Sequence, residues 1–185
     1  ALAKDNREHK FAYLSELEVL KKVMPKRGKG LEIGVGTGRF AVPLGIGTGI
    51  DPSKKMIKIA RQRGIDARLG YGEHLLFRNS TFDYVVSITT LCFVNDPLKV
   101  VREVHRVLKR NGKIYQQKRS IFYKQAKFFS VKEISCFLNE AGFNNLSYYQ
   151  VLFKLPDKIN TIEKPKTGFG KGSFVVISAT KIRSI

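Results

Sequence analysis

The sequence predicts an α/β protein whose sheet is mostly parallel and carries helices on both faces. Short apolar runs alternate with amphipathic runs along the chain, as they do when strands are joined by crossover helices. A glycine-rich loop follows the first expected strand, and an acidic residue ends the second. The chain has 185 residues, of which 43% are apolar, so it is long enough for one domain with a sizeable core.

The first part of the chain predicts alternating helices and strands. An amphipathic helix over 7–24 ends before Gly28. The elements expected after it are strand 30–34, helix 37–44, strand 47–51, helix 53–63, strands 66–69 and 82–88, and helix 97–109. Ser53 and Asp96 are the expected N-caps of two of these helices, and Pro97 suits the first helical position after Asp96.

The remaining elements are predicted from turn and cap signals. Asn111 and Gly112 are expected to end the preceding helix in a left-handed turn. Ser130 and Glu133 have the spacing of a capping box, in which each residue bonds the backbone N–H of the other. The elements expected from there on are helix 130–141, strands near 145–153 and 173–180, and a long joining segment over 156–172.

The loop after the first strand carries an acidic-x-Gly-x-Gly-x-Gly pattern, formed by Glu32, Gly34, Gly36 and Gly38. The glycines allow a tight turn in which a ligand lies against bare backbone, and the following helix offers free N–H groups. A dinucleotide fingerprint needs glycine where Arg39 stands, and the phosphate-binding Gly-x4-Gly-Lys-Ser/Thr pattern is absent. The carboxylate favours a ligand with an ammonium group and no phosphates, which is the composition of S-adenosylmethionine.

A second acidic residue supports this interpretation. Asp51 ends the next expected strand, about one strand–helix–strand unit after Glu32. A carboxylate at that place can accept hydrogen bonds from both hydroxyl groups of a ribose. The alternative is that Asp51 only begins a turn with Pro52.

The sequence resembles the class I S-adenosylmethionine-dependent methyltransferases, in particular the small bacterial "type 11" group. The resemblance covers roughly residues 10–150 and rests on five blocks in the expected order: LEIGVGTGRF, GIDPSKKMIKIAR, LGYGEHLLFRNSTFDYVVS, NDPLKVVREVHRVLKRNGKI and FFSVKEISCFLNEAGF. It implies a Rossmann-like, seven-stranded methyltransferase fold whose last strand is antiparallel. It also implies a single domain over 1–185, with a cap helix (1–28), a cofactor-binding half (29–112) and a substrate-side half (113–185).

The resemblance assigns cofactor-binding roles to particular positions. These are Glu32, Gly34, Gly36, Thr37, Gly38, Asp51, Pro52, Ser53, Gly72, Glu73 and Thr89. The family's Gly-Asp-Ala-Glu turn, which closes over the adenine, reads Gly70-Tyr71-Gly72-Glu73 here. Since Tyr71 replaces the usual Asp, the contact to the adenine amine is either lost or comes from Tyr71 or backbone carbonyls.

The stretch after Gly112 fits the predicted fold poorly. A central parallel strand is normally apolar because it is buried on both faces, whereas residues 113–119 read Lys-Ile-Tyr-Gln-Gln-Lys-Arg. Relatives usually carry a longer segment here that covers the active site. Either this chain has a shortened cover, or residues are missing from the sequence.

Methyl transfer from a sulfonium is an in-line displacement that needs no obligatory catalytic triad. The weak candidates for a base or nucleophile are His9, His74 and Cys92, each of which is also explained as an ordinary helix, loop or core residue. The candidate acceptor pocket is lined by Phe11, Tyr13, Thr90, Phe93, Phe122, Tyr123 and Phe129. Aromatic clusters of this kind also occur as plain core.

Four functions stay open from the sequence, and a dehydrogenase is the least favoured of them because Arg39 replaces the third dinucleotide glycine. The leading one is methyl transfer to a small molecule through an amine, hydroxyl or activated carbon. The second is an RNA or protein methyltransferase, for which the net charge of +19 could supply a basic surface, although the same charge also fits a solvated lysine-rich surface. The third is a protein that binds S-adenosylmethionine without catalysis.

Composition bears on whether the protein spans a membrane or binds a metal, and on its cellular compartment. The apolar runs are too short to span a membrane, and the two cysteines show no metal-ligand spacing. We therefore expect a cytoplasmic protein without a metal site. The chain is expected to be a monomer or a homodimer.

Overall fold

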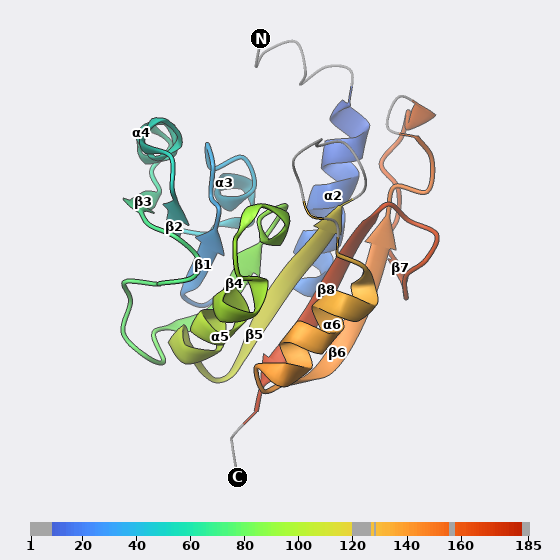
Figure 1. The fold of residues 1–185 in the computed structure, drawn as a ribbon. Coiled ribbons are helices and arrows are strands. Elements are labelled where there is room, and N and C mark those ends of the chain that lie inside the picture. Colours follow the sequence, from blue (N-terminus) through green and yellow to red (C-terminus); the bar gives the residue numbers. More distant parts are fainter. Residues whose placement is uncertain (1–8, 120–126, 128, 156–157, 183–185) are drawn as a thin grey trace.

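The computed structural model describes residues 9–119, 127, 129–155 and 158–182. Its strands form one eight-stranded sheet in the order β3-β2-β1-β4-β5-β8-β6-β7 (Figure 1). The strands are β1 (Gly30–Ile33), β2 (Thr48–Asp51), β3 (Asp66–Leu69), β4 (Phe82–Ser87), β5 (Leu108–Arg119), β6 (Phe143–Val151), β7 (Lys166–Thr167) and β8 (Phe174–Lys181). The helices are α2 (Lys10–Val23), α3 (Ala41–Leu44), α4 (Lys54–Gln62), the 3-10 helix η1 (Leu91–Phe93), α5 (Pro97–Val107) and α6 (Val131–Glu140).

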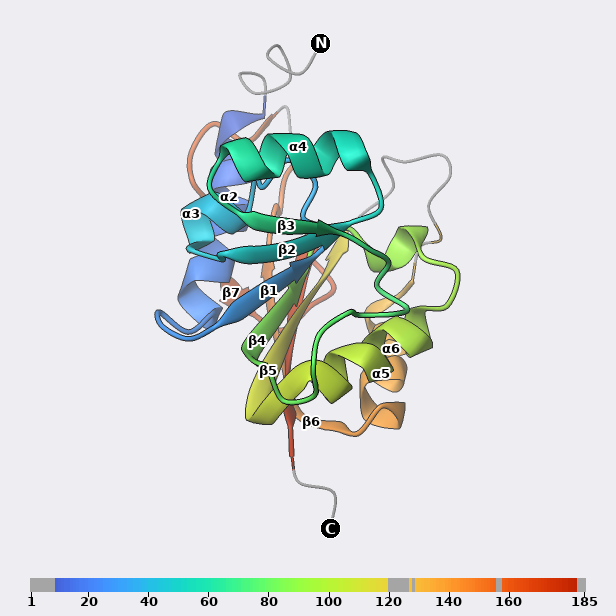
Figure 2. The same ribbon diagram turned by 90° about the vertical axis from the view of Figure 1, so that its left-hand side faces the viewer.

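The sheet has the expected mixed topology. Strands β1 to β5 pair in parallel (Figure 2). The last strand, β8, lies antiparallel between β5 and β6 (Figure 1). The resemblance implies seven strands, whereas the structure has eight. The additional strand is the two-residue β7, which pairs with Tyr149 and Gln150 at the edge of the sheet.

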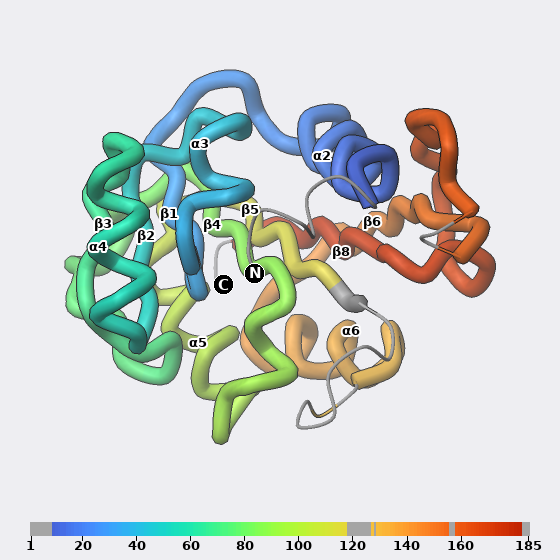
Figure 3. Tube along the Cα trace, turned by 90° about the horizontal axis from the view of Figure 1, so that it is seen from above, coloured from blue at the N-terminus to red at the C-terminus, as the bar shows by residue number. Residues whose placement is uncertain are grey.

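Helices cover both faces of the sheet and divide the core in two. Figure 3 shows α3 and α2 on one side and α5 and α6 on the other. The first core packs residues of α2 and α4 such as Leu20 and Ala60 against Tyr84 and Tyr115 of the sheet. The second packs α5 and α6 against the opposite face of the same strands. The predicted α/β class and its two helical layers are therefore confirmed.

Local cap signals set most helix starts correctly. The Ser53 side chain accepts a hydrogen bond from the Met56 N–H, and Asp96 caps α5 in the same way. Ser130 and Glu133 form the predicted capping box at the start of α6. These contacts satisfy N–H groups that have no partner inside the helix.

The predicted helix 37–44 is wrong in length, because the structure has only the short α3 there. Pro43 lacks an N–H, so it cannot donate to the carbonyl of Arg39 four residues earlier. That carbonyl instead accepts a 2.7 Å hydrogen bond from the Tyr13 hydroxyl of α2. Gly45, with a φ of 69°, then ends the turn in the left-handed conformation.

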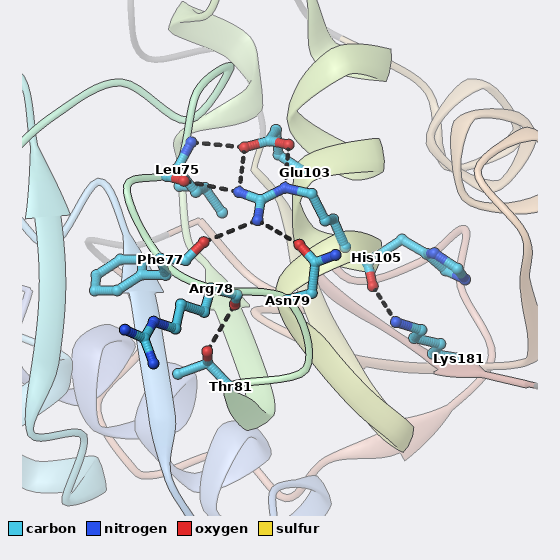
Figure 4. A network of polar contacts seen from close by, with 9 residues as sticks. Leu75, Phe77, Arg78, Asn79, Thr81, Glu103, His105 and Lys181 are labelled. Atoms are coloured by element: carbon cyan, nitrogen blue, oxygen red, sulfur yellow. Dashed lines mark hydrogen bonds and ion pairs between the residues drawn. The ribbon is translucent and has the colours of Figure 1, made fainter.

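The predicted helix 97–109 ends two residues early, at Val107. Leu108 is already extended (ψ 138°) and begins β5, so Asn111 adopts its left-handed conformation inside that strand. The ammonium group of Lys181 on β8 donates to the carbonyls of His105 and Leu108, at 2.6 and 2.7 Å. This cation caps the helix end, as Figure 4 shows for His105.

A polar network fixes the long connection between β3 and β4 against α5 (Figure 4). The guanidinium of Arg106 bonds both carboxylate oxygens of Glu103, at 2.7 and 2.8 Å. It also donates to the carbonyls of Leu75 and Phe77 and to the side chain of Asn79. Glu103 in turn accepts from the Leu75 N–H at 2.7 Å. The network therefore anchors the segment that follows the predicted adenine turn.

Candidate functional site

A cavity of about 280 Å³ opens at the carboxyl ends of β1, β2 and β4. The strand order reverses between β1 and β4, and in open α/β sheets ligands bind at such a reversal. The cavity is lined by Ile33, Gly34, Asp51, Pro52, Gly70, Tyr71, Gly72, Glu73, Thr89, Thr90, Phe93, Val94 and Asn95. Every element around it thus comes from the half of the sheet that carries the glycine loop.

Asp51 joins the end of β2 to the glycine loop. One carboxylate oxygen accepts from the Gly36 N–H and the other from the Ser53 N–H, each at 2.9 Å. Both oxygens keep a further lone pair, and the residue lines the cavity. The carboxylate is therefore oriented by backbone donors and can still accept hydrogen bonds from a bound hydroxyl group.

The glycines of the loop differ in what they permit. Gly34 has a φ of 72°, and a Cβ there would collide with the Thr90 hydroxyl. Gly36 has a φ of 52°, and apart from its chain neighbours no described residue has an atom within 4 Å of the place its Cβ would occupy. Gly34 is thus needed for packing inside the protein, whereas the space beside Gly36 is open to a ligand.

Glu32 lies buried in β1 with 2% of its surface exposed. Desolvation raises its pKa to about 8, and the charge of Asp51 acts in the same direction, while a hydrogen bond from the Ala41 backbone opposes them. Its Oε2 atom has no hydrogen-bond partner among the described residues. Together with the open space at Gly36, a buried acid with a free oxygen fits a ligand that carries an ammonium group.

This acid gives a pH-dependent prediction. Because the folded pKa lies above the ordinary value of 4.5, the stability that Glu32 contributes is fully present below 4.5 and is lost as pH rises through about 8. Without cofactor, raising the pH from 5 to 9 should therefore increase the unfolding free energy of Glu32→Gln relative to that of wild type by about 2 kcal/mol. One pKa unit is worth about 1.4 kcal/mol, and water penetration reduces the full difference.

Urea unfolding at the two pH values measures this gain. Glu18→Gln, which changes an exposed carboxyl of α2, is the matched control and should show none. A stability difference between Glu32→Gln and wild type that does not change with pH would contradict the raised pKa.

The adenine turn is held by contacts from elsewhere in the chain. Glu73 accepts a hydrogen bond from the Asn95 N–H at 3.0 Å, which ties the turn to the loop after η1. A Cβ on Gly72 would lie 3.2 Å from Ile33 and Val100, so the turn packs closely on β1 and α5. Tyr71 is 65% exposed and lines the cavity where the family has Asp.

The structure brings together only part of the predicted cofactor set. The predicted residues that line the cavity are Gly34, Asp51, Pro52, Gly72, Glu73 and Thr89. Those that do not line it are Glu32, Gly36, Thr37, Gly38 and Ser53, although Gly36 and Ser53 bond Asp51. The lining residues that the sequence analysis did not single out are Ile33, Val94 and Asn95. The backbone bond from Asn95 to Glu73 leaves no signal in the sequence.

The acceptor-side candidates are dispersed. Thr90 and Phe93 line the same cavity as the cofactor candidates. Tyr13 packs edge-on against Phe40, and Phe129 packs against Phe137 of α6. Phe11 is partly exposed on α2. Phe122 and Tyr123 lie outside the described residues.

None of the catalytic candidates lines the cavity. His74 is exposed beyond the adenine turn, and His9 precedes α2. The Cys92 thiol donates to the Thr89 carbonyl at 3.6 Å, and burial raises its pKa, so it is a neutral thiol near pH 7.

The described part of the chain contains no group of three acidic, histidine or cysteine side chains able to hold a metal ion. No helix there is long and apolar enough to cross a membrane.

The chain is similar to a family model and to a solved structure. A family model described as a methyltransferase domain matches residues 31–116. A solved structure from Thermotoga maritima, titled an S-adenosylmethionine-dependent methyltransferase and "possible histamine N-methyltransferase", is 41% identical with a TM-score of 0.92. The match covers 97% of this chain and 94% of that one.

Two sequence relatives extend the comparison. An uncharacterized protein of Methanocaldococcus jannaschii is 46% identical over 95% of this chain and 92% of its own length. A demethylmenaquinone methyltransferase of Oceanobacillus iheyensis is 31% identical over 63% of this chain and 57% of its own length. With a near-full-length match of 41% identity to a solved methyltransferase, the chain belongs to the class I S-adenosylmethionine-dependent methyltransferases of the type 11 group and uses S-adenosylmethionine as its cofactor.

Proposed function

We propose that the protein methylates a small molecule, and that the accepting atom is an amine nitrogen. The observation that carries the choice of an amine is that the described residues lining the cavity include no histidine or lysine and only two carboxylates, both engaged by backbone N–H groups. Of its lining carboxylates, Asp51 and Glu73 each accept hydrogen bonds from backbone N–H groups, and His74 lies outside it. A neutral amine already has a nucleophilic lone pair, whereas a hydroxyl group or carbon acid must lose a proton first.

The names of relatives support a small-molecule acceptor. The Thermotoga maritima protein, which is similar over almost the whole chain, is titled a possible histamine N-methyltransferase. The Oceanobacillus iheyensis relative is named for demethylmenaquinone, another small molecule. Hydroxyl and activated-carbon acceptors remain the alternatives within this class.

The residues that line the cavity, together with Gly36 and Glu32 of the adjoining loop and strand, then take the following roles. Asp51 accepts hydrogen bonds from the two ribose hydroxyls, and the open backbone at Gly36 lets the amino-acid part of the cofactor lie close. Glu32 offers its free oxygen to the ammonium group. Gly72 and Glu73 close the turn beside the adenine, with Tyr71 at its rim. Pro52 and Thr89 complete the walls.

The bound cofactor supplies a methyl group on a positively charged sulfur, which is a good electrophile and needs no activation by the protein. In the transfer, the amine lone pair forms the new N–C bond while the C–S bond breaks and its electron pair stays on sulfur. The methylated ammonium then loses a proton to water. The protein's contribution is to hold the acceptor nitrogen in line with that bond and to exclude competing water.

Transfer of a labelled methyl group tests this proposal. The protein is incubated with methyl-labelled S-adenosylmethionine and separate panels of small amines (histamine first), small alcohols and mixed tRNA. Label is expected on an amine, at a rate that rises with pH as the amine loses its proton. Label on tRNA alone would overturn the small-molecule assignment, and binding of the cofactor without transfer to any panel would favour the non-catalytic alternative.

A second candidate, methylation of RNA, is favoured by one specific observation, the net charge of +19. Three lysines, Lys154, Lys164 and Lys166, also line a separate cavity of about 290 Å³ beyond β6. Binding through such charges weakens steeply as the salt concentration rises, because the release of counterions from the nucleic acid becomes less favourable. A tRNA titration at low and high salt distinguishes the two candidates. RNA methylation predicts tRNA binding that weakens as salt rises, whereas the small-molecule proposal predicts cofactor turnover that is insensitive to added tRNA.

A further inference from the structure

Two amide side chains are buried in the centre of the sheet, where apolar residues are expected. Gln116 and Gln117 of β5 are 1% and 3% exposed, between β4 on one side and β8 on the other. Leaving a buried polar group without a partner costs about 1–3 kcal/mol. Each glutamine has such an atom among the described residues: Oε1 of Gln116 and Nε2 of Gln117. A buried polar residue that costs stability in this way needs a structural or functional explanation.

The two glutamines make different contacts. Gln117 Oε1 accepts from both the N–H and the hydroxyl group of Thr89, at 2.8 and 3.0 Å. Gln116 Nε2 donates to the backbone carbonyl of Gln117 at 2.8 Å, so this bond stays on its own strand. The bonds of Gln117 thus reach the segment that leaves β4, whereas the bond of Gln116 stays within β5, which makes Gln116 a natural control.

Thr89 has a backbone conformation that is unfavourable for a threonine. Its φ is 54°, in the left-handed region that β-branched residues rarely occupy. A residue held there costs about 1–3 kcal/mol and persists where its surroundings fix it. The two bonds to Gln117 satisfy both donors of Thr89 in this conformation.

The position of Thr89 bears directly on the cavity, because Thr89 forms part of its wall. The next residue, Thr90, donates its hydroxyl to the Ile33 carbonyl at the end of β1 at 2.9 Å. The turn after β4 is thus fastened to β1 through Thr90 and to β5 through Gln117.

We propose that Gln117 is a positioning residue of the cofactor site: it acts through Thr89, whose strained conformation it fixes so that the wall of the cavity is set before the ligand binds. This explains why a polar side chain occupies the sheet interior. The proposal rests on the cofactor cavity and does not depend on the identity of the acceptor. It concerns a residue that contacts the wall rather than the cofactor itself.

Three variants and one probe, S-adenosylhomocysteine, test this role by calorimetric titration. Gln117→Met keeps the length of the side chain but removes both bonds, and should weaken affinity about tenfold, or about 1.4 kcal/mol. Gln117→Glu keeps an accepting oxygen in either protonation state, so its affinity should lie within about threefold of wild type. Gln116→Met, equally buried on the same strand, should leave affinity within about twofold of wild type. Thermal unfolding of all three variants reports loss of stability separately.

Affinity in Gln117→Met equal to that of wild type would overturn the proposal. So would an equal loss in Gln116→Met, because the effect would then follow from disturbing β5. If Gln117→Met does not fold, Gln117→Asn, whose side chain is one methylene too short to reach Thr89, takes its place and should lose affinity in the same way. Thr89→Gly is the second substitution combined with either variant. Glycine adopts the left-handed conformation without cost, so combining it with Gln117→Met should recover part of the affinity, and a combined loss equal to that expected from independent sites would overturn the role through Thr89. Failure of wild type to bind the probe would instead indicate that the cavity itself is wrongly assigned.

Discussion

Asp51→Ala should weaken the binding of S-adenosylhomocysteine by roughly 30- to 800-fold, or about 2–4 kcal/mol, as measured by calorimetry. The carboxylate loses two roles at once in this variant. It can no longer accept hydrogen bonds from the ribose, and it no longer holds the Gly36 and Ser53 N–H groups, each of which lies 2.9 Å from one of its oxygens. The site should therefore lose both a ligand contact and the order of its loop.

Asp66→Ala is the matched control for this prediction. Asp66 begins the neighbouring strand β3, and its exposed carboxylate pairs with Arg68 at 2.7 Å, away from the cavity. This variant should bind the ligand as wild type does. Unchanged affinity in Asp51→Ala, in a protein that unfolds as cooperatively as wild type, would show that the ribose assignment is wrong.

Gly36→Val should abolish measurable binding while the protein still folds. The space beside Gly36 is empty of protein atoms, so a side chain there meets the ligand and not the core. The cost to folding is limited to the left-handed backbone (φ 52°), about 1–2 kcal/mol. Calorimetry gives the affinity, and urea unfolding gives the stability.

Gly45→Val separates the two effects. Gly45 is also left-handed (φ 69°) with open space beside it. It precedes β2 and so lies near the amino ends of the parallel strands, whereas the cavity lies at their carboxyl ends. It should lose similar stability and keep full affinity. If Gly36→Val binds like Gly45→Val, the ligand does not lie against Gly36.

Local chemistry explains which parts of the fold could be predicted. The caps at Ser53, Asp96 and Ser130 depend on residues within four positions of one another, and each occurs as predicted. The alternation of strands and helices is equally local. The short α3 could not be predicted from its apolar pattern alone, because Pro43 removes a helix hydrogen bond that Tyr13 replaces from a distant helix.

The residues of the site that follow one another at fixed spacing could be predicted, and those that join it through tertiary contacts could not. The glycine loop and Asp51 could be recognised because a ligand that lies against backbone requires small residues and an acceptor at fixed spacing. Asn95 joins the cavity through a tertiary contact with Glu73 that no spacing reveals. The polar end of β5 departed from the expected apolar strand, and the contact from Gln117 to Thr89 offers a physical reason for this.

The most direct test of the account is a parallel calorimetric titration of the wild-type protein with S-adenosylhomocysteine and with NADH. The cavity at the ends of β1, β2 and β4 predicts one site per chain for the adenosyl ligand, with a dissociation constant in the micromolar range, and no heat of binding for NADH. Binding of NADH alone would contradict the assignment of the glycine loop to a phosphate-free ligand, and binding of neither ligand would contradict the proposed cofactor cavity.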